Sequence, residues 1–430
     1  MFGRIRAKTV RLLRWSERYT KTDMVYLATG GFWLGIGSTV ASLSALAVTI
    51  VFANLLPPEI FGTYKFVLSV GAMLSALTLG GLNTALIRAI AQNHSGTVNT
   101  MIRLKLQWGF VAFLVGLGVA TYYVLNDNAQ LATAFLIAAA LIPLVELGGL
   151  YGPILAGGKE FKKNTYYDIA LNGSITVILC TVAFITHNLF ILLTAYFGLW
   201  TLGRLYALYR VTRPYTNAAG SVSGESVLLG KHLSIMGVVN TIASNIDRVL
   251  LFHLLGPVSV AAYSVAISPV ERLTGFSQLI KPLGIPKLSN QVIPMTARGY
   301  WRKFVSVEAV LALGTLVYIL AAPIIFGIIF PQYEHAVLYT QILSLGILSA
   351  ALPFNSSILI ALNARRELYI QSFGANLFKI ILTVVGGYLF GLWGIIGAFV
   401  IARLAYLALS TVQTIFLLNN RQAAYEATTP

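Results

Sequence analysis

The sequence has few charged residues and almost no cysteine. Asp, Glu, Lys and Arg make up 10% of its 430 residues, whereas hydrophobic residues make up 57%. Soluble domains carry about 25% charged residues, so water is not the main solvent of this chain. The single cysteine, Cys180, excludes an internal disulfide and a thiolate metal site, and it lies in an apolar run as core filler.

Signatures of several enzyme classes are also missing. The chain contains no GxxxxGK[ST] phosphate-binding loop, which excludes ATP hydrolysis by that route, and no HExxH zinc motif. The five histidines (His94, His187, His232, His253 and His335) are scattered over different segments rather than clustered. We therefore expect no resident metal and no cofactor.

Long apolar runs recur from one end of the chain to the other. A helix needs about 20 apolar residues to cross the hydrocarbon core of a bilayer. The pattern predicts an all-α polytopic membrane protein with about twelve transmembrane helices in two six-helix bundles. The predicted spans are 29–55, 63–84, 106–125, 131–156, 167–186, 189–210, 230–254, 260–283, 304–329, 337–362, 369–390 and 394–418.

The basic residues alternate along the predicted loops, and this explains the net charge of +16 without any nucleic acid partner. Loops after the odd-numbered spans, such as 126–130, 186–188 and 331–335, contain no Lys or Arg. By the positive-inside rule, both termini and all basic loops are predicted to be cytoplasmic. The basic residues after the even-numbered spans are Arg103, Lys105, Lys159, Lys162, Lys163, Arg213, Lys287, Arg298, Arg302, Lys303, Arg365 and Arg366.

The N-terminal segment, residues 1–25, is basic and cytoplasmic in this topology. Its residues 5–19 mix arginines with large apolar side chains, a pattern typical of a helix lying on the lipid surface. The apolar stretch that follows is too long for the core of a signal peptide and ends without a small-residue cleavage site. We expect it to stay as the first span.

The chain resembles itself at an offset of 199 residues. The segment "LLPPEIFGTY" (55–64) aligns with "LLGPVSVAAY" (254–263), and "GRLYAL" (203–208) aligns with "ARLAYL" (402–407). Six spans per half give the halves the same orientation, so the repeat is parallel. The predicted domains are bundles at 26–214 and 229–418, a Gly- and Ser-rich cytoplasmic linker at 215–228, and a cytoplasmic tail at 419–430. Two bundles on a linker suit alternating access by rocking; the alternative is a static protein in which the repeat reflects ancestry alone.

At this point several segments resemble a known family. "NIDRVLLFHLLGPVSVAAYSVA" (245–266) is similar to the seventh-helix segment of the polysaccharide and O-antigen flippases (Wzx-type) of the MOP superfamily. "LNTALIR" (82–88), "AAPIIFGIIFPQYEHA" (321–336) and "LWGIIGAFVIARL" (392–404) resemble other segments of that family. The resemblance implies translocation of a polyprenyl-diphosphate-linked oligosaccharide from the cytoplasmic to the outer leaflet of a bacterial inner membrane. Pro257 and Val258 depart from the family, which often has a charged residue there.

Charged residues inside predicted spans are the candidates for substrate contact, because a charge at the bilayer centre costs about 2.5–3.5 kcal/mol on insertion scales. Five are basic and three are acidic: Arg204, Arg248, Arg272, Lys379 and Arg403 against Glu146, Asp247 and Glu271. A positive excess at this depth suits an anionic diphosphate headgroup. We predict that Arg248, Arg272, Lys379 and Arg403 line one cationic cleft between the bundles. Arg204, Lys65 near the outer end of the second span and Arg88 near its inner end complete the set.

Alternative interpretations apply to several of these residues. Arg204 and Arg403 are equally compatible with snorkelling to the interface, and Asp247 and Arg248 with a structural pairing to other helices. Glu271 and Arg272 point about 100° apart on one helix and are not obliged to pair with each other. Carboxylates at membrane depth often relay protons or bind coupling ions, so Glu271, Asp247 and Glu146 are candidates for coupling to protons or sodium.

The expected partners are therefore the lipid-linked glycan, the bilayer, a coupling ion and other polysaccharide-assembly proteins. Two competing functions stay open: a multidrug or cation antiporter of the same superfamily, and a membrane glycan polymerase or transferase. The basic excess disfavours the first, and the short outer loops without an acid/base pair disfavour the second. We expect a transporter and not an enzyme.

Overall fold

The computed structural model describes residues 24–213, 221–276, 296–362 and 364–428, which form helices and short connections without any strand. The predicted surface helix at 5–19 and the basic loop residue Lys287 lie outside these ranges. The helices are α2 (Met24–Leu55), α3 (Pro58–Ala76), α4 (Leu82–Ala91), α5 (Thr97–Leu125), α6 (Ala129–Gly148), α7 (Tyr151–Gly157), α8 (Phe161–Ile185), α9 (Leu189–Thr212), α10 (Gly224–Leu255), α11 (Pro257–Phe276), α13 (Ala297–Ile329), η3 (Pro331–Ala336), α14 (Val337–Ser344), η4 (Leu345–Ala351), α15 (Leu352–Ala361), α16 (Arg365–Tyr369), η5 (Ile370–Gly374) and α17 (Ala375–Thr428).

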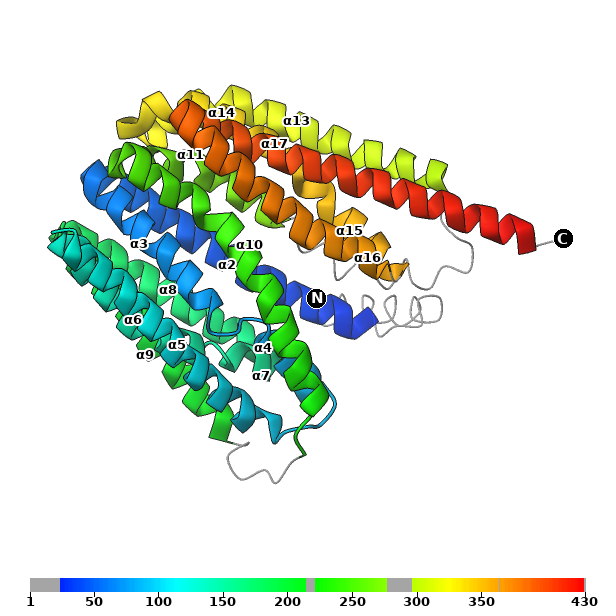
Figure 1. Ribbon diagram of the computed structural model, residues 1–430, viewed down its shortest axis with the longest axis horizontal. Helices are drawn as coiled ribbons and strands as arrows, with labels where there is room; N and C mark the ends of the chain where they lie inside the picture. The colour runs from blue at the N-terminus through cyan, green and yellow to red at the C-terminus, as the bar shows by residue number, and fades with distance from the viewer. Residues whose placement is uncertain (1–23, 214–220, 277–295, 363, 429–430) are drawn as a thin grey trace, which may run out of the picture.

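The described helices account for twelve crossings, which confirms the predicted fold class. Nine helical segments are long and apolar enough to span a membrane in the described part of the chain. The helices α3 and α11 add two crossings; they have 19 and 20 residues and carry charges. The last crossing comes from α17, which folds back on itself at Gly391, so its two arms run side by side (Figure 1).

The fold-back of α17 depends on glycine at two positions. Gly391 has a φ of 58°, in the left-handed region where only glycine is free of strain. A Cβ atom on Gly394 would lie 1.8 Å from the carbonyl oxygen of Gly386 on the opposite arm. Gly391 therefore permits the turn between the two arms, and the missing side chain of Gly394 permits their close approach.

The internal repeat has a counterpart in the helix positions. Pro58 and Pro257 begin α3 and α11 and are 199 residues apart, and Thr97 and Ala297 begin α5 and α13 and are 200 apart. A proline at the first turn of a helix has no unsatisfied N–H and has its φ already in the helical range.

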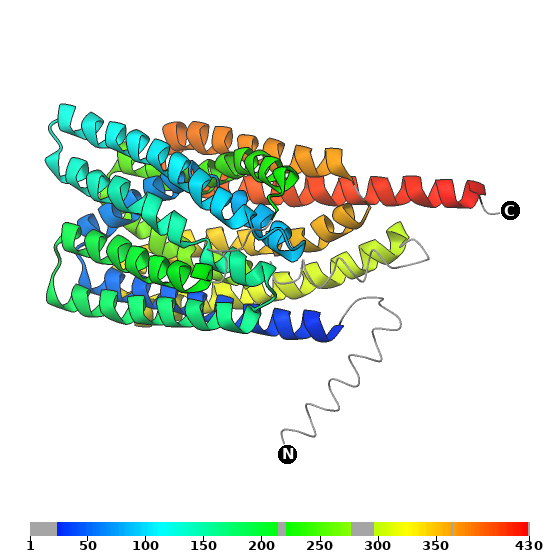
Figure 2. The ribbon, with the colours of Figure 1, turned by 90° about the horizontal axis from the view of Figure 1, so that it is seen from below.

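The helices run along the long axis of the molecule, so it has two distinct ends (Figures 1 and 2). At one end, which we call the turn end, single residues or short turns join consecutive helices, and Asn128 and Asn188 cap α6 and α9 with their side chains. At the opposite end, which we call the basic end, α2 begins and α9 and α17 finish. The residues that define the basic end are Arg88, Lys159, Lys162, Lys163, Arg210, Arg213 and Arg302.

The two halves meet at the turn end. The rings of Phe66 on α3 and Phe252 on α10 stack with 3.9 Å between centroids. The Asn54 amide donates to the carbonyl of Ile329 at 2.8 Å, and the Gln332 amide donates to the carbonyl of Asn54 at 2.9 Å. Toward the basic end the halves diverge, and α10 leaves the C-terminal half to pack on α4 (Figure 1).

Some predicted boundaries are wrong for local reasons. The predicted span 63–84 is interrupted after Ala76, and Leu79 has a φ of 60° before α4 begins. The segment predicted as linker to residue 228 is helical from Gly224, because the Ser223 side chain caps α10 by accepting from the N–H of Ser226. The segment predicted as tail continues α17 as far as Thr428.

Candidate functional site

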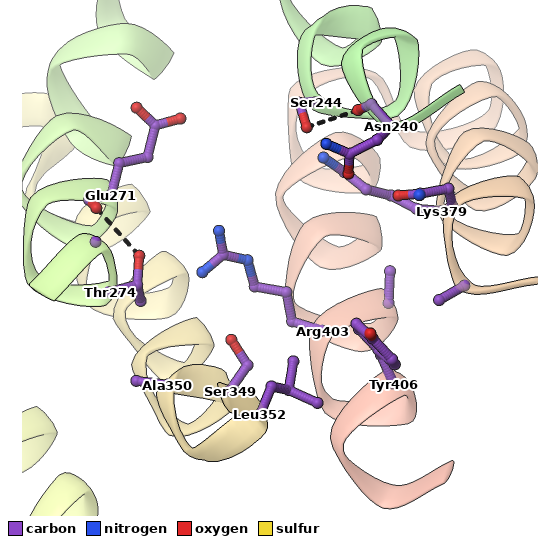
Figure 3. Close-up of a pocket in the computed structure, with 14 residues that line it drawn as sticks. Asn240, Ser244, Glu271, Thr274, Ser349, Ala350, Leu352, Lys379, Arg403 and Tyr406 are labelled. Atoms are coloured by element: carbon purple, nitrogen blue, oxygen red, sulfur yellow. Dashed lines mark hydrogen bonds between the residues drawn. The ribbon is translucent and has the colours of Figure 1, made fainter. Parts of the chain in front are cut away.

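A cavity of about 390 Å³ lies within the C-terminal half and contains two of the predicted cations. Its wall is built by α10, α11, η4, α15 and both arms of α17, so residues more than 160 positions apart in sequence share it. Lys379 lies beside Asn240 on one side, and Arg403 projects across the middle toward Glu271 and Thr274 on α11 (Figure 3). We call this space the C-half cavity.

The Arg403 guanidinium is held over an aromatic ring. Its central carbon lies 4.4 Å from the centroid of Phe399, one turn earlier on α17. One terminal nitrogen donates to the carbonyl of Gly346 at 3.5 Å, which is a long and weak hydrogen bond. The Lys379 ammonium lies 5.7 Å from the same ring centroid. Neither cation has a carboxylate within ion-pair distance among the described residues, so both are available to an anion.

Glu271 and Asp247 have fixed protein partners. Glu271 accepts from the Arg248 guanidinium at 2.9 Å, and this ion pair joins α11 to α10. Asp247 is buried and accepts from the Tyr263 hydroxyl at 2.6 Å and from the backbone N–H of Arg248 at 2.9 Å. Arg248 is therefore neutralised by an acid.

A second cavity, of about 210 Å³, lies where α11 meets the N-terminal half. We call it the inter-half cavity. It is lined by Lys65 on α3 and Arg272 on α11, together with aromatic, hydroxyl, amide and five aliphatic side chains of α2, α3, α8 and α9. The Lys65 ammonium lies 3.4 Å from the Thr49 hydroxyl. No side-chain hydrogen bond or ion pair of Arg272 is found within the described residues, and its buried Nε has no partner.

The prediction of one cleft lined by four cations is therefore wrong in its geometry. Lys379 and Arg403 line the C-half cavity, Arg272 lines the inter-half cavity, and Arg248 lines neither. The reason is the 100° step between neighbouring helical positions, which points Glu271 to one cavity and Arg272 to the other. Because Glu271 and Arg272 are consecutive residues of α11, the two cavities adjoin the same helix from different sides.

Besides Arg248 and Asp247, three more predicted residues lie outside both cavities. Arg204 repeats the geometry of Arg403 at the 199-residue offset: it lies 4.6 Å from the Trp200 ring and 3.4 Å from the carbonyl of Val145. Arg88 forms an ion pair with Glu225 of α10 at 2.8 Å near the basic end. Glu146 is paired with Lys105 at 3.2 Å.

Lys105, the partner of Glu146, is predicted from the sequence to lie in a basic loop, and that prediction is wrong. Lys105 lies inside α5, its side chain is 0% exposed, and it also donates to the Thr78 hydroxyl at 3.2 Å. Asp168 is a further charged residue that the sequence analysis did not select, and it accepts from the Tyr151 hydroxyl at 2.5 Å. Its position near the start of a predicted span was the available signal.

Replacing Glu146 with leucine is expected to lower the free energy of unfolding by about 3–5 kcal/mol, because Lys105 would be left buried without an acidic partner. The double variant Lys105→Met with Glu146→Leu is expected to recover most of this loss, as measured by thermal unfolding in detergent. The control is the half-exposed pair Lys163 and Glu160, 3.1 Å apart, where Glu160→Gln should cost less than about 1 kcal/mol. Normal transport by a stable double variant would remove Glu146 from ion coupling.

Helices long and apolar enough to cross a bilayer, arranged in two halves around charged internal cavities, define a multi-pass membrane protein. The sequence matches the family of polysaccharide biosynthesis proteins over residues 27–282, and the chain belongs to that family. A comparison with curated protein sequences gives no match.

Solved structures agree on the fold. An inward-facing multidrug resistance MATE family transporter of the MOP superfamily is 15% identical, covers 91% of this chain and 96% of its own, and superposes with a TM-score of 0.67. The lipid II flippase MurJ in an inward closed conformation is 12% identical, covers 92% and 87%, and also gives 0.67. An outward-facing MATE family transporter is 14% identical, covers 94% and 96%, and gives 0.57.

Proposed function

We propose that the chain is a flippase that moves a polyprenyl-diphosphate-linked oligosaccharide from the cytoplasmic to the outer leaflet of a bacterial inner membrane, for O-antigen or exopolysaccharide assembly. The observation that carries the proposal is the unneutralised positive charge of the two cavities. Lys65, Arg272, Lys379 and Arg403 have no ion-pair partner among the described residues, and Glu271 is already paired with Arg248.

This charge matches the physical obstacle to flipping such a lipid. A diphosphate carries up to two negative charges, and an isolated anion in hydrocarbon is prohibitively costly. An arginine offers two parallel N–H donors to phosphate oxygens, and a lysine adds a mobile point charge. The polyprenyl tail needs no cavity, because it can stay in the bilayer beside the protein while the headgroup crosses.

Hydroxyl and amide side chains of the C-half cavity support the same assignment. Asn240, Ser244 and Ser349 line it together with Lys379 and Arg403. The Asn240 amide can donate a neutral hydrogen bond to a phosphate oxygen that the two cations do not reach, whereas the Ser244 and Ser349 hydroxyls donate to the carbonyls of Asn240 and Gly346. We therefore assign the diphosphate to the C-half cavity.

Alternating access accounts for the movement. The halves meet at the turn end and diverge toward the basic end (Figure 1), and the higher TM-score is with the inward-facing relative. If the basic end is cytoplasmic, as the positive-inside rule predicts, this conformation loads substrate from the cytoplasmic leaflet. Glu271 lines the C-half cavity and Asp247 accepts from the neighbouring Arg248 N–H, so we propose them, ahead of Glu146, as the groups that couple transport to protons or sodium.

Deleting the gene in a polysaccharide-producing host tests the function. Complete lipid-linked repeat units are expected to accumulate on the cytoplasmic leaflet, and the full-length chain is expected to restore export. In vesicles containing the purified protein, the flipping of a lipid-diphosphate sugar should respond to a proton or a sodium gradient. Accumulation of incomplete units would instead favour a polymerase or transferase, and transport of cationic dyes without any flipping would favour a multidrug antiporter.

A further inference from the structure

The inter-half cavity differs from the C-half cavity in its aromatic content. Three aromatic side chains line it, Tyr64, Tyr196 and Trp200, whereas Tyr406 is the one aromatic side chain among the residues that line the C-half cavity. Trp200 is held in place by the Arg204 guanidinium, 4.6 Å from its ring centroid. Flat aromatic rings with polar edges are the surface on which the C–H faces of sugar rings pack.

The polar lining of the inter-half cavity also suits a sugar. Ser44, Thr49, Thr176 and Asn172 reach it from α2 and α8, which places hydroxyl and amide groups around the rings. These groups both donate and accept hydrogen bonds, as sugar hydroxyls require. At about 210 Å³ the cavity is smaller than the roughly 300–1,000 Å³ of sites for drug-sized ligands, so it suits one ring better than an oligosaccharide.

A neutral sugar does not explain the two cations. Lys65 and Arg272 line the inter-half cavity, and no carboxylate does. The Lys65 ammonium has one long hydrogen bond, to the Thr49 hydroxyl, and lies 5.3 Å from the centroid of the Phe61 ring, while the Arg272 Nε is buried without a partner. Buried donors of this kind are costly to leave unpaired, and an acidic group on the ligand would pair with both.

We propose that the inter-half cavity is a subsite for a carboxylate-bearing sugar, such as a hexuronic acid, at or near the diphosphate end of the glycan. Trp200 and Tyr196 pack against the ring, while Lys65 and Arg272 hold its carboxylate. The diphosphate occupies the C-half cavity, on the other side of the Arg248–Glu271 pair. This assignment rests on the proposed function and adds a substrate class to it.

Binding of three synthetic short-chain prenyl diphosphates to the purified full-length protein tests the proposal. One probe carries no sugar, one carries a neutral hexose and one carries a hexuronic acid. The wild type is expected to bind the hexuronic probe about tenfold more tightly than the hexose probe, because charge-assisted hydrogen bonds are stronger than neutral ones. The double variant Lys65→Gln with Arg272→Gln should lose this preference, and Arg272→Lys should keep part of it.

The matched variant is Lys379→Gln with Arg403→Gln, which should weaken the binding of all three probes by similar factors. Trp200→Leu should weaken the binding of both sugar-bearing probes more than it weakens the binding of the bare lipid diphosphate. Equal wild-type affinity for the hexose and hexuronic probes would overturn the subsite. The subsite would also be overturned if the Lys65 and Arg272 double variant lost as much affinity for the bare lipid diphosphate as the matched variant does. The inter-half cavity would then hold the diphosphate. If the wild type binds none of the three probes, the flippase function itself fails.

Discussion

Replacing Lys379 and Arg403 together with glutamine is expected to lower the rate of lipid-diphosphate flipping by about two to four orders of magnitude. Hydrogen bonds to charged groups contribute about 1.5–3 kcal/mol each, and each 1.4 kcal/mol is a factor of ten in affinity. Neither residue has a carboxylate partner among the described residues, so the substitution removes attraction for an anion without leaving an acid exposed. The measurement is initial flipping rate in vesicles at substrate concentrations below saturation.

Two kinds of control separate charge from structure. Arg403→Lys and Lys379→Arg keep the charge and should retain a substantial part of the rate. Arg204→Gln removes an arginine with the same local geometry, a ring one turn earlier and a carbonyl on a neighbouring helix, but outside the C-half cavity. Its effect on the flipping of a bare lipid diphosphate should be much smaller, because Arg204 reaches the proposed sugar subsite only through Trp200. Flipping at the wild-type rate by the Lys379 and Arg403 double variant would remove the C-half cavity as the diphosphate site.

The architecture could be predicted from the sequence because its signals are long and repeated. Each crossing extends over about 20 residues, and a turn such as that at Pro57 or Gly256 is recognisable from proline or glycine. The equivalence of Arg204 and Arg403 was also visible at the 199-residue offset. Their ring partners Trp200 and Phe399 follow the same offset, so the repeat extends to individual contacts.

The arrangement of charges could not be predicted in the same way. Lys105 has the sequence context of a loop lysine, yet α5 begins at Thr97 and carries it into the protein interior, where Glu146 pairs with it. Whether a cation faces an acid, a ring or a cavity depends on helices that are distant in sequence. Arg248 and Arg403 look alike in a list of buried charges, and only the neighbouring Glu271 side chain distinguishes them.

In the sequence, the net excess of cations within the predicted spans is the feature that favours an anionic substrate. The structure gives that excess a distribution: one cation pair lines each of two cavities, while Glu271, which also lines the C-half cavity, is neutralised by Arg248. A divided site can hold the headgroup and the first sugar at the same time. One undivided cleft would provide charge but no means to distinguish one lipid-linked glycan from another.

Cross-linking the two halves at the turn end is expected to abolish transport completely, because the cavities can reach the outer leaflet only if that interface opens. Asn54 and Gln332 are suitable positions: the Gln332 amide donates to the Asn54 carbonyl at 2.9 Å, and Gln332 is exposed. The double variant Asn54→Cys with Gln332→Cys can be treated with a short bifunctional thiol reagent in a Cys180→Ser background, since Cys180 is the one native cysteine. Flipping should then fall to the level of protein-free vesicles.

The reversibility of the cross-link distinguishes a locked protein from a damaged one. If the reagent links the two cysteines through disulfide bonds, their reduction should restore flipping. Flipping by each single-cysteine variant should be insensitive to the reagent. The cross-linked protein should still bind a prenyl diphosphate from the basic end, because the link holds the halves in the conformation in which that end diverges (Figure 1). Undiminished flipping by a fully cross-linked protein would exclude rocking of the two halves. The substrate would then have to cross along a path that leaves the contacts of Asn54 and Phe66 with the C-terminal half intact.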